Sequence, residues 1–301
     1  MDVQHVKSIT AYHRLLQLPG PVHPLISVID YSQVKHEKDA ASFVMDYYSI
    51  ALKRNLPVKL RYGQQEYDFD EGLMSFIAPG QVLRVEPLPV TTLQPQGYLL
   101  LIHPDFLWRS PLAKTIRQYG FFDYAVNEAL FLSDKEEATI TQILENIQQE
   151  YHSNIDQFTQ DLIIAQVELL LKYADRFYHR QFLTRKISNH QTLSKVEEFL
   201  TAYFSNENLA DKGLPTVQQV AEHLHMSANY LSSLLKVLTG QNTQQHIHNK
   251  LIEKAKEKLS VTNSSISEIA YELGFEHPQS FSKLFKSKTD MSPHEFRASF
   301  N

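Results

Sequence analysis

The sequence predicts an α+β protein with two domains: a small β barrel followed by two long helices, and then an all-α domain with two helix-turn-helix units joined by a linker helix. Three observations predict this fold class. The chain has 301 residues, and at about 150 residues per domain this length suggests two domains. Glycine and proline punctuate residues 20–97, which is typical of short strands joined by turns. An internal repeat with a spacing of 49 or 50 residues occupies the C-terminal third.

The composition limits the class of protein. Apolar residues make up 43% of the chain and charged residues 21%, so the chain can bury a core. The absence of cysteine excludes disulfide scaffolds, thiolate nucleophiles and cysteine-ligated zinc. The first twenty residues contain Lys7 and Arg14 and no apolar segment, so we expect no signal peptide. The most apolar run, Leu162–Leu171, is too short to cross a membrane. We therefore expect a cytoplasmic protein without membrane contact.

Six short runs of apolar residues predict the strands of the barrel, at about residues 20–105. The runs at 47–52 and 58–62 partly alternate between apolar and polar residues, as expected of half-buried strands. The six runs are Leu25–Tyr31, Tyr47–Leu52, Val58–Tyr62, Leu73–Ile77, Val82–Val85 and Tyr98–Ile102.

Two long helices are expected after the barrel, at about residues 133–180. Ser133 and Glu136 have the spacing of a capping box, and the second helix is expected at about 156–178. These helices would pack on the barrel or on a second subunit, with an internal hairpin as the alternative. The polar stretch 185–192 is expected to be a linker. It divides the chain into a domain at 1–184 and a domain at 193–301.

The C-terminal domain contains the internal repeat. Val220-Ala221 and Ile269-Ala270 are 49 residues apart, and Leu234-Leu235-Lys236 and Leu284-Phe285-Lys286 are 50 apart. The slip of one residue falls in the turn between the two helices of each unit, where an insertion is tolerated. We therefore expect two copies of one helix-turn-helix unit, joined by a helix at about Thr243–Leu259.

Each unit has residues that start and stop helices. A hydroxyl residue followed three positions later by glutamine or glutamate begins the first helix of each unit. The turn of the second unit has a glycine, which can adopt positive φ, and a proline then stands near the first position of the next helix. These residues are Thr216 with Gln219, Ser227, Ser265 with Glu268, Gly274 and Pro278.

The second helix of each unit separates apolar from polar side chains. No acid lies between residues 229 and 236 or between 279 and 288. Amides and cations recognise base edges in the major groove, and hydroxyls and cations bind phosphate. The alternative is that both are ordinary solvent-exposed helix faces. The outward residues are Ala228, Asn229, Ser232, Ser233 and Lys236 in the first unit and Gln279, Ser282, Lys283 and Lys286 in the second.

This region resembles the DNA-binding domain of the AraC/XylS family of bacterial transcription regulators. Residues 217–240 are similar to its first helix-turn-helix, and residues 266–297 to its second and more diagnostic one. The resemblance covers about a third of the chain. It rests on Ile269-Ala270, Gly274-Phe275, Phe281, Phe285-Lys286, Ser292-Pro293 and Arg297.

The sequence departs from the family pattern at four positions. Asp290 replaces the usual glycine, but aspartate tolerates left-handed backbone, so we expect the turn to survive. His246 and Leu251 stand where the linker helix usually has an aromatic residue and an arginine. Lys283 replaces an arginine, and a lysine is a point charge rather than a bidentate donor, so guanine recognition there is less expected.

The resemblance implies a sequence-specific regulator that binds double-stranded DNA in two successive major grooves. It also implies a homodimer, contact with RNA polymerase and, as the more common outcome, activation of transcription. The residues carried over as base-facing are Asn229, Ser232 and Ser233 in one groove and Gln279, Ser282 and Lys283 in the next, and those carried over as phosphate-binding are Lys236 and Lys286.

The N-terminal domain resembles, more weakly, the cupin-like sensor domain that many family members have. The resemblance rests on the strand pattern, on Gly72–Gly80 and on the two helices after Ser133, and it implies a small-molecule effector. The candidate effector-binding residues are Arg61, Tyr62, Tyr67 and Trp108. Two alternatives are a barrel that binds a protein partner or only dimerises, and a DNA-binding architectural protein without a sensor.

The main enzymatic alternative is a cupin-type enzyme fused to a DNA-binding domain. Such an enzyme needs a His-x-His pair in the barrel, and residues 20–103 contain only three separated histidines, at 23, 36 and 103. The pairs His223/His225 and His246/His248 point about 200° apart on a helix and cannot chelate one ion. No catalytic triad or phosphate-binding loop is evident. We therefore expect no enzymatic activity, no cofactor and no metal site.

The net charge is −5, from 29 basic and 34 acidic residues. From residue 193 onward there are 11 basic and 12 acidic residues, and the preceding part holds 18 and 22. Most of the acidity therefore lies outside the predicted DNA-binding domain. The lysines of the second helices are expected to matter through their arrangement on one face rather than through net charge.

Overall fold

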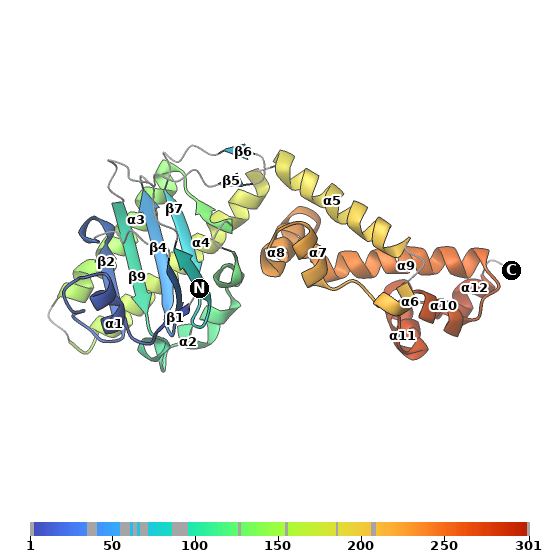
Figure 1. Ribbon diagram of the computed structural model, residues 1–301, viewed down its shortest axis with the longest axis horizontal. Helices are drawn as coiled ribbons and strands as arrows, with labels where there is room; N and C mark the ends of the chain where they lie inside the picture. The colour runs from blue at the N-terminus through green and yellow to red at the C-terminus, as the bar shows by residue number, and fades with distance from the viewer. Residues whose placement is uncertain are drawn as a thin grey trace. The chain divides into compact units, whose positions relative to one another are not determined.

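The computed structural model contains two compact units, Met1–Gln181 and Phe182–Asn301 (Figure 1). It describes residues 3–34, 41–54, 61–62, 65–66, 72–85, 96–125, 128–153, 156–184, 186–205 and 209–299. The strands lie in the first unit and the second unit is helical, which confirms the mixed α+β class. The expected linker is 185–192, and its residues 186–192 belong to helix α5 (Lys186–Phe204), while residue 185 lies outside the described residues.

The larger sheet of the first unit has five antiparallel strands in the order β10-β7-β4-β9-β2. Its central strand, β4, places Ile50 opposite Phe76 on one side and Leu100 on the other. Four of its five strands match predicted runs. The strands are β2 (Ile26–Asp30), β4 (Tyr48–Arg54), β7 (Leu73–Ile77), β9 (Gln96–Ile102) and β10 (Leu130–Phe131).

A second sheet has the order β1-β3-β8, from β1 (Val3–Val6), β3 (Ala41–Met45) and β8 (Val82–Val85). Strands β5 (Arg61–Tyr62) and β6 (Gln65–Glu66) form a two-residue ladder. The sequence did not predict β1, β3 or β10. Strand β1 is exposed at three of its four residues, and β10 has only two residues, so neither has an apolar pattern long enough to detect.

The prediction that the strand at 47–52 is half-buried is wrong, because β4 is buried on both faces. Ala51 packs in a cluster with Phe43 and Leu99, which joins the two sheets. On the opposite face, the ring of Tyr48 lies 5.0 Å from that of Phe122. A strand between two apolar layers does not need a polar face.

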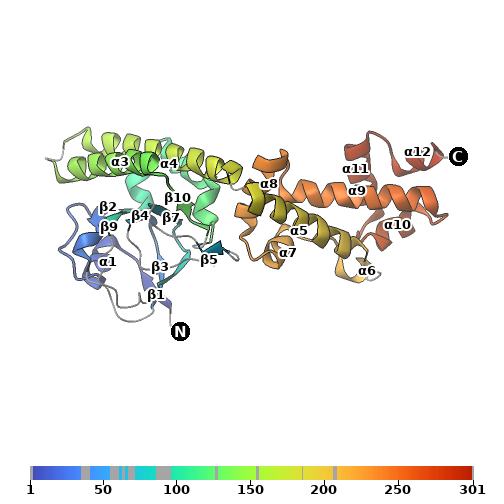
Figure 2. The ribbon, with the colours of Figure 1, turned by 90° about the horizontal axis from the view of Figure 1, so that it is seen from above.

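Helices α3 (Asp134–His152) and α4 (Thr159–Thr184) run side by side over the larger sheet (Figure 2). The capping box of Ser133 and Glu136 is present, as predicted. The side chain of Glu136 also pairs with Arg180 of α4, at 2.6 Å. The first unit also contains α1 (Ile9–Leu15), α2 (Leu112–Thr115) and short 3₁₀ turns that include Tyr31–Gln33, Pro104–Leu107, Ile116–Gln118 and Gly120–Asp123.

The second unit packs all its helices around one hydrophobic core. Its long helix α9 (Thr243–Val261) contributes Leu251 and Ala255, and α5 contributes Val196. The other helices are α6 (Leu209–Lys212), α7 (Val217–His223), α8 (Ala228–Thr239), α10 (Ile266–Glu272), α11 (Pro278–Thr289) and α12 (Pro293–Ala298). Among the described residues, no helix is long and apolar enough to cross a membrane.

Candidate nucleic-acid interface

Helices α7 and α8 form the first helix pair of the second unit. Thr216 and Gln219 make the expected capping box at the start of α7. Between the helices, His225 has φ 56°, a left-handed conformation that few non-glycine residues adopt. Ser227 then begins α8 by accepting a hydrogen bond from the amide of Tyr230, at 3.2 Å. Two tight caps thus fix the angle at which α8 leaves the turn.

Helices α10 and α11 form the second pair with the same plan. Ser265 and Glu268 cap α10, Gly274 has φ 85°, and Pro278 stands in the first turn of α11. Each of these placements agrees with the sequence prediction. Hydrogen bonds from the Ser265 amide and hydroxyl lower the pKa of Glu268, so the cap stays ionised at neutral pH.

The equivalence of the two pairs continues beyond the second helix of each. The hydroxyls of Thr239 and Thr289 donate to the carbonyls of Leu235 and Phe285, both at 2.8 Å. Left-handed residues follow, Gly240 at φ 76° and Asp290 at φ 60°, so aspartate does support the turn. Capping boxes then begin the next helices, with Asn242 and Gln245 before α9 and Ser292 and Glu295 before α12.

The predicted base-facing residues divide into two groups. Asn229, Gln279 and Lys283 are exposed, and Ser233 is half-buried. The hydroxyls of Ser232 and Ser282 make internal hydrogen bonds. The Ser232 hydroxyl lies 3.0 Å from that of Thr243, a fully buried residue of α9, and the Ser282 hydroxyl donates to the carbonyl of Pro278 at 3.1 Å. The bond of Ser232 has no sequence signature, whereas serine in a helix often bonds the carbonyl four residues earlier, as Ser282 does.

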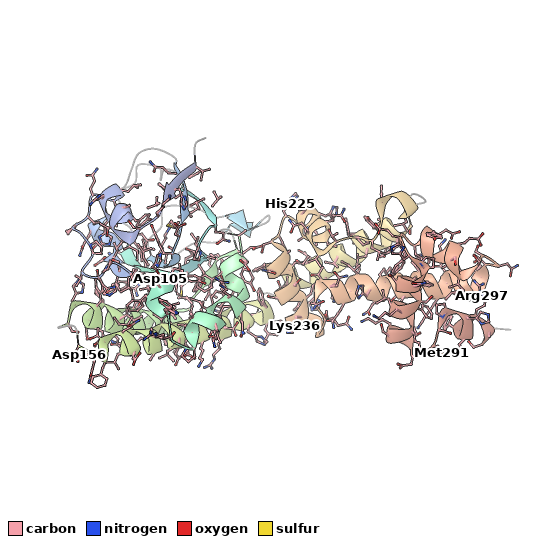
Figure 3. The ribbon with its side chains drawn as sticks, turned by 90° about the horizontal axis from the view of Figure 1, so that it is seen from below. Asp105, Asp156, His225, Lys236, Met291 and Arg297 are labelled. Atoms are coloured by element: carbon pink, nitrogen blue, oxygen red, sulfur yellow. The ribbon has the colours of Figure 1, made fainter. Side chains whose placement is uncertain are left out.

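The lysines of α8 and α11 differ from those of α9. Three α9 lysines form ion pairs: Lys250 with Glu253, Lys254 with Glu257, and Lys258 with Glu272. A fourth, Lys256, lies 5.8 Å from the centre of the Phe296 ring. In contrast, the lysines of α8 and α11 are exposed and form no ion pair with the residues that the structure describes. They are Lys236 (Figure 3), Lys283, Lys286 and Lys288.

The charges of some of these free lysines lower the pKa of neighbouring groups. Lys286 contributes to lowering the pKa of Glu295, after the hydrogen bonds from Ser292. Burial lowers the pKa of His248 on α9, and the charge of Lys288 lowers it further. Lys286 and Lys288 therefore act electrostatically on the neighbouring helices α12 and α9.

Helix α9 holds the two pairs at a fixed separation. Its 19 residues span about 28 Å at 1.5 Å per residue, near the 34 Å or so that separates successive turns of a duplex. The end of α9 is held by Arg297 of α12, which Figure 3 labels. Its Nε donates to the carbonyl of Leu259 at 3.4 Å. Both helix pairs also contribute to the same core.

The paired histidines of α9 have local partners. His246 Nε2 lies 2.9 Å from the hydroxyl of Thr239, and His248 Nε2 lies 2.8 Å from Nε2 of Gln244. Among the described residues, no three histidine, aspartate or glutamate side chains gather in a way that could hold a metal ion.

The candidate effector residues are mostly outside the described structure. Arg61 and Tyr62 belong to β5, but their side chains, and the whole of Tyr67, lie outside the described residues. Trp108 is 75% exposed, at the end of a 3₁₀ turn. The four residues therefore remain predictions.

Comparison with known proteins places the second unit in a family. A family model described as a helix-turn-helix domain matches residues 220–299. An uncharacterised helix-turn-helix-type transcriptional regulator, YfiF of Bacillus subtilis (strain 168), is 32% identical over 137 residues, covering 46% of this chain and 40% of that protein. Another, of Staphylococcus aureus (strain MSSA476), is 25% identical over 147 residues, covering 48% of this chain and 18% of that protein.

The chain thus spans less than half the length of these relatives. Among solved structures, an AraC-type transcriptional regulator from Chromobacterium violaceum is 19% identical, with a TM-score of 0.33; the match covers 38% of this chain and 95% of that one. The C-terminal part of this chain is an AraC-type helix-turn-helix domain.

Proposed function

We propose that the chain is a sequence-specific DNA-binding transcription regulator that reads two successive major grooves with α8 and α11. One observation carries the proposal. The lysines on these two equivalent helices form no ion pair with described residues, whereas three of the four lysines on α9 are neutralised by glutamates. The charge of a lysine without a carboxylate partner remains available to attract phosphate groups. The names of the relatives, which are transcriptional regulators, support the same function.

Each helix then has base-reading and phosphate-binding positions. Asn229, Ser232 and Ser233 on α8 and Gln279, Ser282 and Lys283 on α11 face bases, and Lys236 and Lys286 bind phosphate. Ser232 and Ser282 already have one internal hydrogen bond each. Because a hydroxyl oxygen has two lone pairs, each can still accept a bond from a base.

Selection from random duplex DNA by the purified full chain tests the proposal. The expected product is a site with two conserved segments about ten base pairs apart. In binding assays with that site, Gln279→Ala should change base preference in one segment only, by about 1–3 kcal/mol for the affected base pair. Recovery of no sequence above background would refute the proposed function.

We also propose that the N-terminal unit is a cupin-like sensor that dimerises. Three apolar side chains in the first half of α4 or just before it are exposed to solvent: Phe158 at 59%, Leu162 at 52% and Leu169 at 43%. Leu162 and Leu169 are seven residues apart, so they lie on one face, as in a helix that pairs with a second copy. Leu162→Glu should therefore convert a dimer into a monomer in sedimentation analysis, whereas Asp161→Ala should not.

Effector binding and contact with RNA polymerase complete the proposal. An effector in the first unit would change how the second units of a dimer engage their two sites, and activation is the favoured outcome. A reporter assay with the selected site tests the direction, because loss of an activator lowers expression. A second candidate, a barrel that binds a protein partner in place of an effector, predicts instead that a protein co-purifies with the first unit.

A further inference from the structure

Helix α4 does not end within the first unit. The first unit ends at Gln181 and the second unit begins at Phe182, although both residues lie on α4. Both side chains are buried, Gln181 at 1% exposure and Phe182 at 3%. A single helical turn thus contributes neighbouring buried side chains to the two units.

On the first-unit side, this turn is bonded to the backbone of strand β10. Gln181 accepts a hydrogen bond from the amide of Phe131 at 2.9 Å and donates to the carbonyl of Ala129 at 3.2 Å. Arg180 donates to the carbonyl of Phe131 at 2.7 Å. Strand β10 pairs through its other edge with β7, Leu130 opposite Met74. Breaking these bonds would leave buried polar groups unsatisfied, so β10 and this turn should move together.

On the second-unit side, Phe182 packs on the first reading helix. Its ring meets that of Tyr230 edge to face, with 5.1 Å between centroids. Its carbonyl accepts a hydrogen bond from Asn189 of α5, a buried residue. Tyr230 is 2% exposed and stands between Asn229 and the Ser232–Ser233 pair. A shift of Phe182 would therefore displace the turn of α8 that contains the base-facing residues.

The second helix pair has no such contact among the described residues. The residue equivalent to Tyr230 is Ser280, fifty positions later, and it is exposed. It lines an open hollow of about 560 Å³ together with Tyr271, Phe275 and His277. The internal repeat therefore differs at the position on which Phe182 packs.

We propose that Phe182 is a positioning residue that couples strand β10 to α8, so that the state of the first unit acts on one reading helix and not directly on the other. The inference rests on the proposed function and adds its regulation. On this account α11 is a constant anchor on DNA, and α8 is the helix whose engagement is controlled.

Coupling between two sites is reciprocal in free energy, so the test needs no effector. Hydrogen exchange of the full chain is measured with and without the selected DNA, and the DNA segments protected by each reading helix are mapped by footprinting. DNA should slow exchange of the Phe131 amide by about threefold or more. In Phe182→Ala, this effect should disappear, and the α8 segment should lose protection while the α11 segment keeps it.

Two further variants separate coupling from folding. Leu183→Ala changes the next residue of α4, whose side chain is 46% exposed, and should behave like the natural chain. Phe182→Leu keeps an apolar side chain for folding but removes the aromatic contact, and should reproduce Phe182→Ala in a weaker form. Suppose that the natural chain protects both DNA segments. The coupling is then refuted, and the proposed function stands, if DNA does not change exchange of the Phe131 amide. The same conclusion follows if Phe182→Ala reduces the protection of both segments equally. If the natural chain protects no DNA, both are refuted.

Discussion

The two helix pairs of the second unit have the same backbone plan and different surroundings. Both have a capped first helix, a left-handed turn residue and a second helix closed by a threonine and another left-handed residue. The first pair places a histidine, one free lysine and a buried tyrosine where the second has a glycine, three free lysines and an exposed serine. The shared plan is set by local sequence, whereas the differences follow from what packs against each pair.

The largest expected difference is at the left-handed residue between the two helices. A β-carbon at Gly274 would lie 2.9 Å from the carbonyl carbon of Gly213 and 3.0 Å from the carbonyl oxygen of Leu209, in addition to its positive φ. Gly274→Ala should therefore lower the free energy of unfolding by about 3 kcal/mol. His225 already has a β-carbon at φ 56°, so His225→Ala should lower it by less than about 1 kcal/mol.

Urea unfolding of the two variants checks this difference. If Gly274→Ala and His225→Ala lower the free energy of unfolding equally, the backbone of α6 does not constrain the second turn.

The distribution of free lysines predicts a difference in salt dependence. Replacing Lys286 and Lys288 together by alanine should reduce the slope of log K against log salt by about 1.8, since each phosphate contact contributes about 0.9. Lys236→Ala should reduce it by about 0.9 and weaken binding to all sequences alike. Lys254→Ala is the matched control, because this lysine is paired with Glu257. A control that flattens the slope as much as Lys236→Ala would contradict the assignment of the phosphate contacts.

A smaller effect is expected at the residues that close α8 and α11. Gly240 has φ 76°, and a β-carbon added there would meet no atom within 4 Å, so Gly240→Ala should cost about 1 kcal/mol from backbone conformation alone. Asp290→Gly should stabilise by about 0.5–1 kcal/mol for the same reason. Thermal unfolding should show shifts of opposite sign, and shifts of the same sign would contradict the equivalence of the two turns.

The smallest effect concerns pH. His246 and Phe296 occupy equivalent positions after the capping boxes, and burial lowers the pKa of His246, with Glu197 opposing the shift. Below its ordinary pKa of about 6.5, the unfolded state binds a proton that the folded state resists, so stability should fall as pH falls below this value. His246→Phe should reduce this loss in a series of unfolding curves from pH 7.5 to 5. If His246→Phe leaves the pH dependence of stability unchanged, other groups cause the loss.

Much of the second unit could be predicted from the sequence, because its signals are local. The capping boxes at Thr216 and Ser265, the glycine at 274 and the proline at 278 all act within a few residues, and each is where it was expected. Four of the five strands of the larger sheet were also predicted, although their burial on both faces was not.

The contacts that were missed join residues far apart in the chain. The bond between Ser232 and Thr243, the bonds between Gln181 and β10 and the packing of Phe182 on Tyr230 have no sequence signature, because a polar or aromatic side chain does not specify a distant partner. The same holds for the lysines, since their number is in the sequence but their pairing depends on which glutamates lie within reach.

The sequence by itself therefore determined the repeated helix pairs, their caps and the residue types on the reading helices, since hydrogen bonds over three or four residues and helical periodicity fix these features. Only the tertiary structure decided which outward hydroxyls are already bonded, which lysines remain free and which reading helix α4 contacts. These depend on packing between segments separated by as many as 48 residues, as between Phe182 and Tyr230, and packing selects among side-chain placements that local sequence leaves equally favourable.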